Sequence, residues 1–110
     1  MDLEPANAAP ILQATLDDLE RLLQQGFGTS LTLRRNYGDW LRVEASADGF
    51  RAEHHDAATG RLHDCEDLWP VEQARDAARA YFDGHWTWRQ GAWRQRANAA
   101  SASRLPDATD

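Results

Sequence analysis

Residues 69–84 have the sequence WPVEQARDAARAYFDG, and this stretch decides the fold. Pro70 suits the first position of a helix, where its missing N–H is not needed, and it holds Trp69 extended before the helix. Gly84 suits a helix end, because glycine adopts the left-handed cap conformation at low cost. Between these limits, small and apolar residues recur at three- and four-residue spacing, which predicts a helix packed closely on a sheet. This stripe is made of Val71, Ala74, Ala77, Ala78, Tyr81 and Phe82.

A second apolar stripe near the N-terminus predicts a helix over residues 8–25. Asn7 can cap this helix, Pro10 is tolerated in its first turn, and Gly26 can end it. The stripe is made of Ile11, Leu12, Thr15, Leu16, Leu19, Leu22 and Leu23.

Residues 29–66 alternate between apolar and polar side chains, which predicts an antiparallel meander of three or four strands. A loop at residues 36–38 places Leu33 opposite Leu41 and Leu31 opposite Val43, so that the apolar side chains share one face.

A turn at Asp48 and Gly49, a dipeptide favoured in tight hairpins, predicts the next pairing. It places Ala47 opposite Phe50 and Val43 opposite His54. A five-residue loop over 56–60 then leads into residues 61–65, and it places Glu53 opposite His63.

Alternation returns in residues 86–95, where Gly91 predicts a bulge or a turn within a final strand or hairpin. The predicted fold is therefore α+β, in the order α-β-β-β(β)-α-β, with both helices on one face of the sheet. Residues 1–96 form a single domain, and residues 97–110 have too few apolar side chains to fold, which predicts a disordered tail. The predicted core is Leu16, Leu19, Leu23, Leu33, Leu41, Val43, Phe50, Leu62, Ala74, Ala78 and Phe82.

The charge of the chain limits its partners. The net charge is −6, and all twelve basic residues are arginine, a habit typical of GC-rich bacterial genomes. An acidic protein disfavours nucleic acid and anionic membranes as partners, because phosphate binding needs a basic surface. No signal peptide or membrane-spanning run is evident, and the one cysteine agrees with a reducing compartment. We therefore expect a cytoplasmic protein.

The residues that could carry catalysis are few. Glu53, His55, His63 and Cys65 would share the outer sheet face in the predicted register, and zinc accepts such ligands. Their spacing lacks the close pairs of structural zinc sites, so a solvated polar face is the favoured interpretation and no metal or cofactor is expected. His63 and Cys65 also point the same way as a nucleophile pair, but the acids beside Cys65 disfavour its thiolate.

The tryptophans allow two interpretations. With a turn at residues 90–91, Trp86, Trp88 and Trp93 fall on one face. Burial statistics favour a core role for that face, whereas the alternative is an exposed recognition surface. Trp40 lies on the outer face in the predicted register and is the best single candidate for an exposed anchor.

The segment from Leu68 to Trp88, with Tyr81, Phe82 and Gly84 at its centre, resembles part of the small immunity proteins of bacterial polymorphic-toxin systems. The resemblance is to the α+β group found beside deaminase-type toxins, and it covers about half of the chain. It implies a protein that neutralises a cognate toxin by tight binding, without catalysis.

We therefore expect a non-catalytic binding protein with a basic toxin domain as its partner. The alternative is a regulatory or adaptor domain that acts as a homodimer or on another protein, and a metal-dependent enzyme is the third hypothesis. The buried stripes use the apolar residues of both helices, so the partner surface is predicted on the outer sheet face and the acidic run after it. Its residues are Trp40, Arg42, Glu44, Glu53, Asp64, Glu66 and Asp67.

Overall fold

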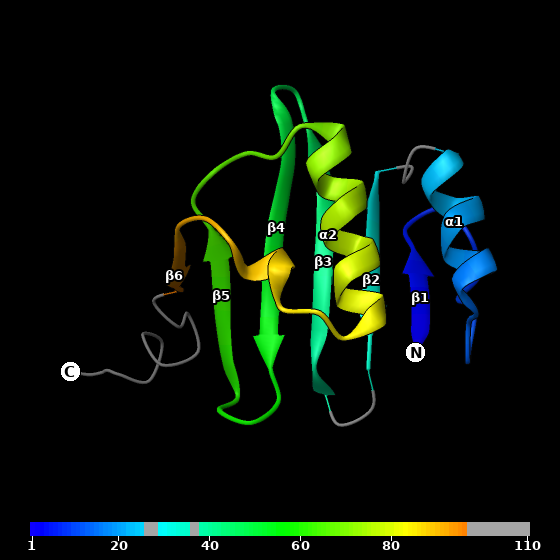
Figure 1. Cartoon of the computed structure of the whole chain (residues 1–110), viewed down its shortest axis with the longest axis horizontal. Coiled ribbons are helices and arrows are strands. Elements are labelled where there is room, and N and C mark those ends of the chain that lie inside the picture. The colour runs from blue at the N-terminus through cyan, green and yellow to red at the C-terminus, as the bar shows by residue number, and fades with distance from the viewer. Residues whose placement is uncertain (26–28, 36–37, 97–110) are drawn as a thin grey trace.

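The computed structural model describes residues 1–25, 29–35 and 38–96, and it has the predicted α+β architecture. One antiparallel sheet of six strands has a spatial order that follows the chain order (Figure 1). The strands are β1 (Asp2–Pro5), β2 (Ser30–Arg34), β3 (Trp40–Ser46), β4 (Gly49–Asp56), β5 (Arg61–Cys65) and β6 (Trp93–Gln95). The helices are α1 (Leu16–Gln24), α2 (Val71–Asp83) and a short 3-10 turn, η2 (Thr87–Arg89). The predicted tail at 97–110 lies outside the described residues.

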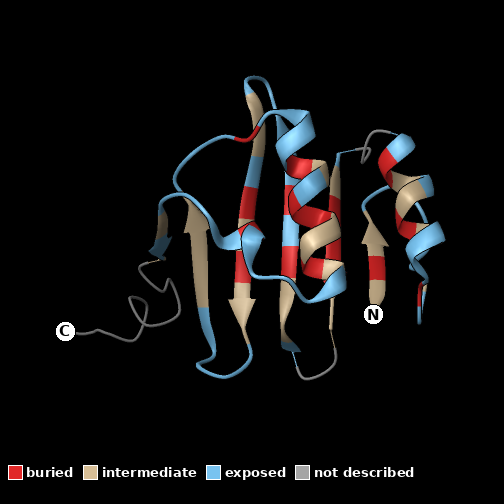
Figure 2. Cartoon of the chain, viewed as in Figure 1, coloured by how far each residue is buried: buried red, intermediate tan, exposed pale blue. Residues whose placement is uncertain are grey.

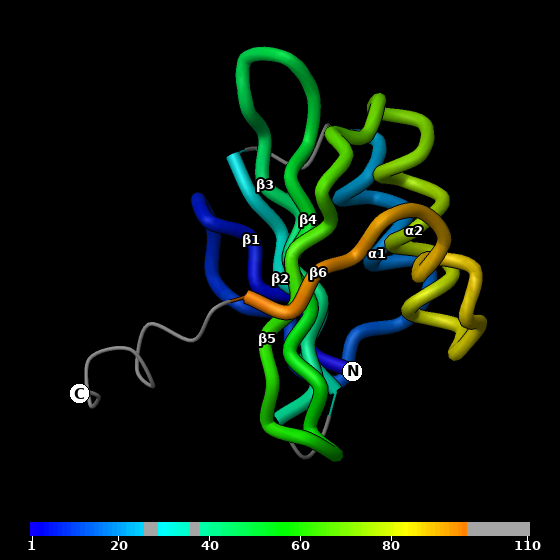
Figure 3. The backbone as a smooth tube through the Cα atoms, turned by 90° about the vertical axis from the view of Figure 1, so that its left-hand side faces the viewer, coloured from blue at the N-terminus to red at the C-terminus, as the bar shows by residue number. Residues whose placement is uncertain are grey.

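Both α-helices lie on one side of the sheet, as predicted (Figure 3). We call the covered side the inner face and the other side the outer face. No helix in the described part of the chain is long and apolar enough to cross a membrane.

The N-terminal region differs from the predicted helix. Residues 2–5 form β1, with Leu3 opposite Leu33, and residue 11 continues this edge through a bridge between Leu3 and Ile11. The helix begins only at Leu16, so the prediction for residues 8–15 is wrong.

Thr15 caps this helix instead of Asn7. Its hydroxyl accepts a hydrogen bond from the Asp18 N–H, and the Asp18 carboxylate accepts one from the Thr15 N–H. This reciprocal pair satisfies donors that the first helical turn cannot. Pro10 lies outside the helix, and Gly26 lies outside the described residues.

The strand pairings confirm the first predicted register. Leu31 lies opposite Val43, and Leu33 lies opposite Leu41. The β3–β4 pairing is two residues away from the prediction, because Ala47 and Asp48 form the turn and Gly49 already pairs with Ser46. A shift of two residues preserves the faces, so Val43 and His54 still point inward.

The β4–β5 pairing is displaced by one residue from the prediction, and this changes which side chains of β5 lie on each face of the sheet. Glu53 lies opposite Asp64, and His54 lies opposite His63. A shift of one residue moves every side chain of a strand to the other face. His63 therefore lies on the inner face, and Leu62, which was predicted in the core, pairs with His55 on the outer face.

The second helix forms as predicted except at its first residue. Pro70 was predicted as the first helical residue, but it is extended and precedes the helix, which begins at Val71; Gly84 ends the helix with a φ of 80°. Trp69 is buried and exchanges two backbone hydrogen bonds with Phe50, which joins the entry of α2 to β4.

The core lies between α2, α1 and strands β1–β4 (Figure 2). Most of the predicted core is confirmed, while Phe50 and Phe82 are half-buried against it. Leu16 is 44% exposed, so its prediction as a core residue is wrong. Leu3 and Trp69 add bulk that was not predicted in the core, and Tyr81 of the predicted helical stripe and Trp88 are buried as well.

Candidate functional site

The outer face carries most of the predicted partner-binding residues, and neither α-helix lies on it (Figure 3). Strand alternation and register place Trp40, Arg42 and Glu44 on β3, Glu53 on β4 and Asp64 on β5 side by side. The structure thus brings together five of the predicted residues.

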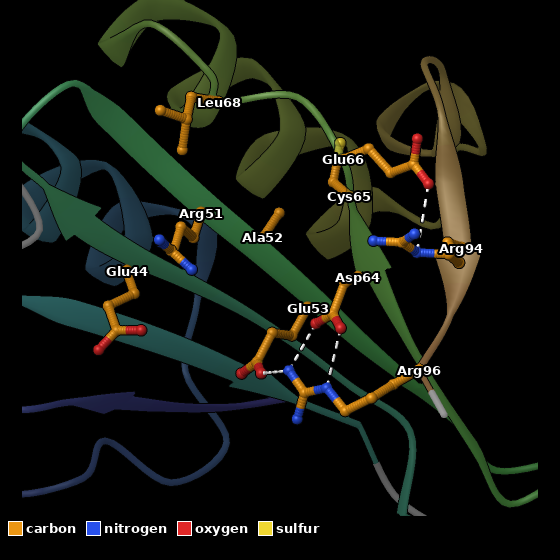
Figure 4. Close-up of a pocket in the computed structure, with 10 residues that line it drawn as sticks. All are labelled: Glu44, Arg51, Ala52, Glu53, Asp64, Cys65, Glu66, Leu68, Arg94 and Arg96. Atoms are coloured by element: carbon orange, nitrogen blue, oxygen red, sulfur yellow. Dashed lines mark hydrogen bonds and ion pairs between the residues drawn. The ribbon is translucent and has the colours of Figure 1, made fainter. Parts of the chain in front are cut away.

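Arg96 joins two carboxylates of this face (Figure 4). Its Nε donates to Asp64 Oδ2 at 2.8 Å, and its Nη2 donates both to Asp64 and to Glu53. Glu53 also accepts from Arg42 Nη1 at 3.2 Å. The hydrogen bonds to Asp64 and Glu53 raise the pKa of Arg96, so it stays charged. Arg42, Glu53, Arg96 and Asp64 therefore form one ordered row of alternating charge across three strands and the residue after β6.

A hollow of about 410 Å³ opens beside this row. Glu66, at its rim, pairs with Arg94 at 3.3 Å (Figure 4). The lining residues are Glu44, Arg51, Ala52, Glu53, Asp64, Cys65, Glu66, Leu68, Arg94 and Arg96. Asp67 is exposed in the following loop and does not line the hollow, so it separates from the other predicted residues.

Trp40 is held in a fixed orientation on the outer face. Its ring stacks on the His55 ring with centroids 5.7 Å apart, and the Arg42 guanidinium lies 5.9 Å from its centroid. His55 is in turn fixed by a 2.7 Å hydrogen bond between Nδ1 and the Gly38 carbonyl oxygen. The indole is only half-buried, so a large aromatic surface is both oriented and accessible.

The outer face is less acidic than the sequence suggests. Its carboxylates and those at the hollow are Asp2, Glu4, Glu44, Glu53, Asp64 and Glu66, and its arginines are Arg34, Arg42, Arg51, Arg94 and Arg96. Six carboxylates against five arginines nearly cancel. The excess negative charge of the molecule therefore lies on other surfaces.

The predicted metal candidates do not converge. Glu53 and His55 point to the outer face, whereas His63 and Cys65, which were predicted beside them, point to the inner face. Among the described residues, no three His, Cys, Asp or Glu side chains are close enough to hold a metal ion. The cause is the one-residue difference in the β4–β5 register.

Cys65 is a half-buried side chain packed against the core. Burial raises the pKa of its thiol, and the carboxylates of Asp67 and Glu66 raise it further. The thiol is therefore predominantly protonated at neutral pH and is a weak nucleophile.

A buried polar network on the inner face was not predicted. Tyr81 Oη donates to Asp39 Oδ1, and His54 Nε2 lies 3.1 Å from the same oxygen. An ionised carboxylate only accepts hydrogen bonds, so His54 Nε2 carries the proton of this bond. Arg35 completes the group. Its guanidinium lies 3.9 Å from the Tyr81 ring centroid, and its Nη2 donates a hydrogen bond to the Tyr81 carbonyl oxygen.

The environment shifts the pKa values of this network. Burial lowers the pKa of His54 below 6.5, although the bond to Asp39 opposes the shift. Burial also raises the pKa of Tyr81, and the bond to Asp39 adds to the effect. For Asp39, burial opposes ionisation, but the hydrogen bonds from Tyr81 and His54 keep its pKa below 3.8. A charged Asp39 between two neutral donors ties α2 to β3 and β4. Strand alternation predicted the inward position of His54. It did not predict the contacts with Asp39 and Tyr81, because these residues are distant from His54 in the sequence.

The three C-terminal tryptophans take different environments. Trp88 lies in η2 and is buried against His54, Tyr81 and Trp93. Trp93 begins β6 and is half-buried, whereas Trp86 is 68% exposed. The predicted strand is therefore confirmed for residues 93–95 and wrong for residues 86–89, and neither interpretation holds for all three rings.

Comparison with known proteins adds nothing to this geometry. No protein-family model matches the chain, and neither a curated protein nor a solved structure matches it.

Proposed function

We propose that this chain is a binding protein that recognises a protein partner through its outer sheet face. The observation that carries the proposal is the accessible Trp40 ring, which is oriented by His55 and Arg42 before any partner arrives. Tryptophan and arginine dominate the binding energy of protein interfaces. A side chain that is already ordered loses less conformational entropy on binding, which favours affinity.

The charged row beside Trp40 supports specificity. Its alternating arginines and carboxylates are already paired within the chain. A partner must match this pattern, since an unmatched charge would be desolvated without compensation. The hollow next to the row provides a recess for one partner side chain.

We propose further that the partner is a bacterial toxin domain, which the chain neutralises as an immunity protein without catalysis. The resemblance of residues 68–88 to immunity proteins supports this identity. The net charge of −6 supports a basic partner, because whole-molecule charge steers association even when the contact face itself is balanced.

Binding kinetics with the toxin domain of a neighbouring gene test the proposal. Trp40→Ala should speed dissociation about thirtyfold, which corresponds to an anchor of about 2 kcal/mol. Trp86→Ala is the matched control, because it removes an exposed tryptophan on the opposite side of the fold. Equal effects of the two variants, or no effect of Trp40→Ala, would exclude the outer face.

Charge reversal separates steering from anchoring. Asp64→Lys combined with Glu66→Lys should slow association and weaken its dependence on salt, while dissociation changes less. Thermal unfolding of the variant must show an intact fold, because Asp64 also binds Arg96.

One observation favours the alternative of a homodimer. The Glu66 N–H donates to the Ala92 carbonyl and the Arg96 N–H to the Leu62 carbonyl, so the backbone groups of Trp93 and Gln95 point away from β5. Such an edge can pair with another strand. Light scattering distinguishes the homodimeric adaptor from the toxin-binding protein. A stable dimer that Gln95→Pro converts to a monomer supports the adaptor role.

A further inference from the structure

The inner face is unevenly covered. Helix α2 packs on β2, β3 and β4, while only the short η2 lies over the part of the inner face toward β5 (Figure 1). Register places His54, Asp56, Arg61, His63, Trp93 and Gln95 on this part of the inner face.

Two hollows remain here, and they share His63 and Arg89 as lining residues. The first, of about 210 Å³, is lined by His54, His63, Trp88, Arg89, Gly91 and Trp93. The second, of about 460 Å³, is lined by Asp56, Thr59, Arg61, His63, Arg89 and Gln95. The first has aromatic walls, and the second is polar.

Several hydrogen-bonding groups at these hollows lack protein partners. His63 Nδ1 and Trp93 Nε1 are buried and have no hydrogen-bond partner among the described residues. Buried polar atoms are nearly always satisfied, by protein, water or a ligand. The Arg89 guanidinium lies 5.3 Å from the Trp88 ring centroid, and no carboxylate in the described part of the chain pairs with it.

These groups share one chemistry. The indole N–H and the guanidinium only donate hydrogen bonds, and a neutral imidazole can donate from Nδ1. Arg61 adds a second positive charge, although one of its nitrogens already donates to Gln95 Oε1 at 2.9 Å. Asp56 is the one carboxylate of the lining, and its oxygens are engaged by the Ala58 N–H and the Thr59 hydroxyl.

We propose that these hollows bind a small molecule bearing a carboxylate or phosphate group. Its oxyanion pairs with the Arg89 guanidinium, and small movements of the His63 and Trp93 rings let their buried N–H groups donate to it. A flat apolar part lies against the aromatic wall of the first hollow. His54, which lines the first hollow, is held in place by its hydrogen bond to Asp39. This site is on the face opposite the proposed protein interface, so either proposal can fail alone.

The test is a titration of the full chain with acetate, benzoate or inorganic phosphate, with sodium chloride at matched ionic strength as reference. Histidine side-chain resonances report His63, and tryptophan fluorescence reports Trp88 and Trp93. We expect saturable shifts of the His63 resonances with at least one oxyanion and no comparable change with chloride. A response to benzoate above acetate indicates a ring-bearing carboxylate, and a response to phosphate alone indicates a phosphate compound.

Arg89→Ala should weaken this binding about tenfold, as expected for the loss of one charge-assisted contact. Arg94→Ala is the matched control, since it removes an exposed arginine from the outer face. Unmoved His63 resonances with all three anions would overturn the proposal and assign the unpartnered atoms to water. Equal weakening by Arg89→Ala and Arg94→Ala would also overturn it, because it would show nonspecific attraction of anions.

Discussion

Glu53 and Asp64 lie directly opposite each other on β4 and β5, and Arg96 binds both carboxylates. Two like charges at facing strand positions destabilise a sheet unless a cation lies between them. Arg96, which follows β6, therefore stabilises the pairing of β4 with β5.

Arg96→Ala should lower the free energy of unfolding by about 1 kcal/mol, because it leaves the two carboxylates facing each other. Urea denaturation measures the change. Adding Asp64→Asn should recover part of the loss, since it removes the repulsion. Arg94→Ala breaks one exposed ion pair and should cost less than about 0.5 kcal/mol; an equal loss would contradict a specific role for Arg96.

Tyr81→Phe should destabilise the protein by about 2 kcal/mol, because it removes a buried hydrogen bond to an ionised group. Urea denaturation of Tyr81→Phe, Asp39→Asn and the double variant forms a mutant cycle. The double variant should be more stable than the sum of the single losses predicts. Additive losses would show that the two groups do not interact.

Acidification should destabilise the protein in two stages. Burial depresses the pKa of His54, so below pH 6.5 the unfolded state gains a proton before the folded state does, and stability falls. Asp39 also has a depressed pKa, so its contribution is lost only below pH 3.8.

Denaturation at pH 7 and pH 5 tests the first stage. His54→Gln should reduce the loss of stability between these values, whereas His55→Gln on the outer face should not. An unchanged loss in His54→Gln would assign the pH dependence to other groups.

Gly49→Ala should destabilise the protein by about 2–3 kcal/mol. An added Cβ would lie 2.9 Å from the Trp69 carbonyl oxygen, and the residue has a φ of 150°. The clash would separate the Phe50–Trp69 backbone pair at the entry of α2. Gly60→Ala is the control: its φ is 69°, but its Cβ would meet nothing within 4 Å, so about 1 kcal/mol is expected. Thermal unfolding would contradict this account if the two variants lost the same stability.

Gly49 also explains one limit of sequence reasoning. The Asp48-Gly49 dipeptide predicts that glycine occupies the turn, whereas the chain needs glycine where Trp69 approaches β4. The turn moves to Ala47 and Asp48, and the register moves by two residues. Local turn preference was overruled by a contact twenty residues away in sequence, but the inward and outward faces stayed correct.

The β4–β5 register shows the stronger limit. Residues 61–65 hold one leucine among polar side chains, so alternation alone does not decide which face is buried. Leu62 was predicted in the core, but His63 takes the inward position, where its ring stacks on the His54 ring with centroids 6.5 Å apart. This one-residue difference in register separates the predicted metal candidates, and it also places His63 at the hollows of the inner face.

The outer-face residues Trp40, Arg42, Glu44 and Glu53 were predictable because the β2–β3 apolar pattern is unambiguous. The contact of Arg96 with Glu53 was not predictable, since Arg96 follows a strand of three residues whose position only the fold determines. Likewise, β1 has no strong strand pattern of its own and forms because Leu3 completes the core beside Leu33.

The agreement between chain order and spatial order in the sheet has a consequence for folding. The β2–β3, β3–β4 and β4–β5 pairs each close a short loop, whereas β1 and β6 join only after a chain segment containing a helix has closed. Short loops cost little entropy, so assembly can start at the central hairpin and proceed outward. Backbone amides of β3 and β4 should then exchange with deuterium last, and those of β6 first, so the edge bearing Trp93 opens most often while the centre of the sheet stays intact.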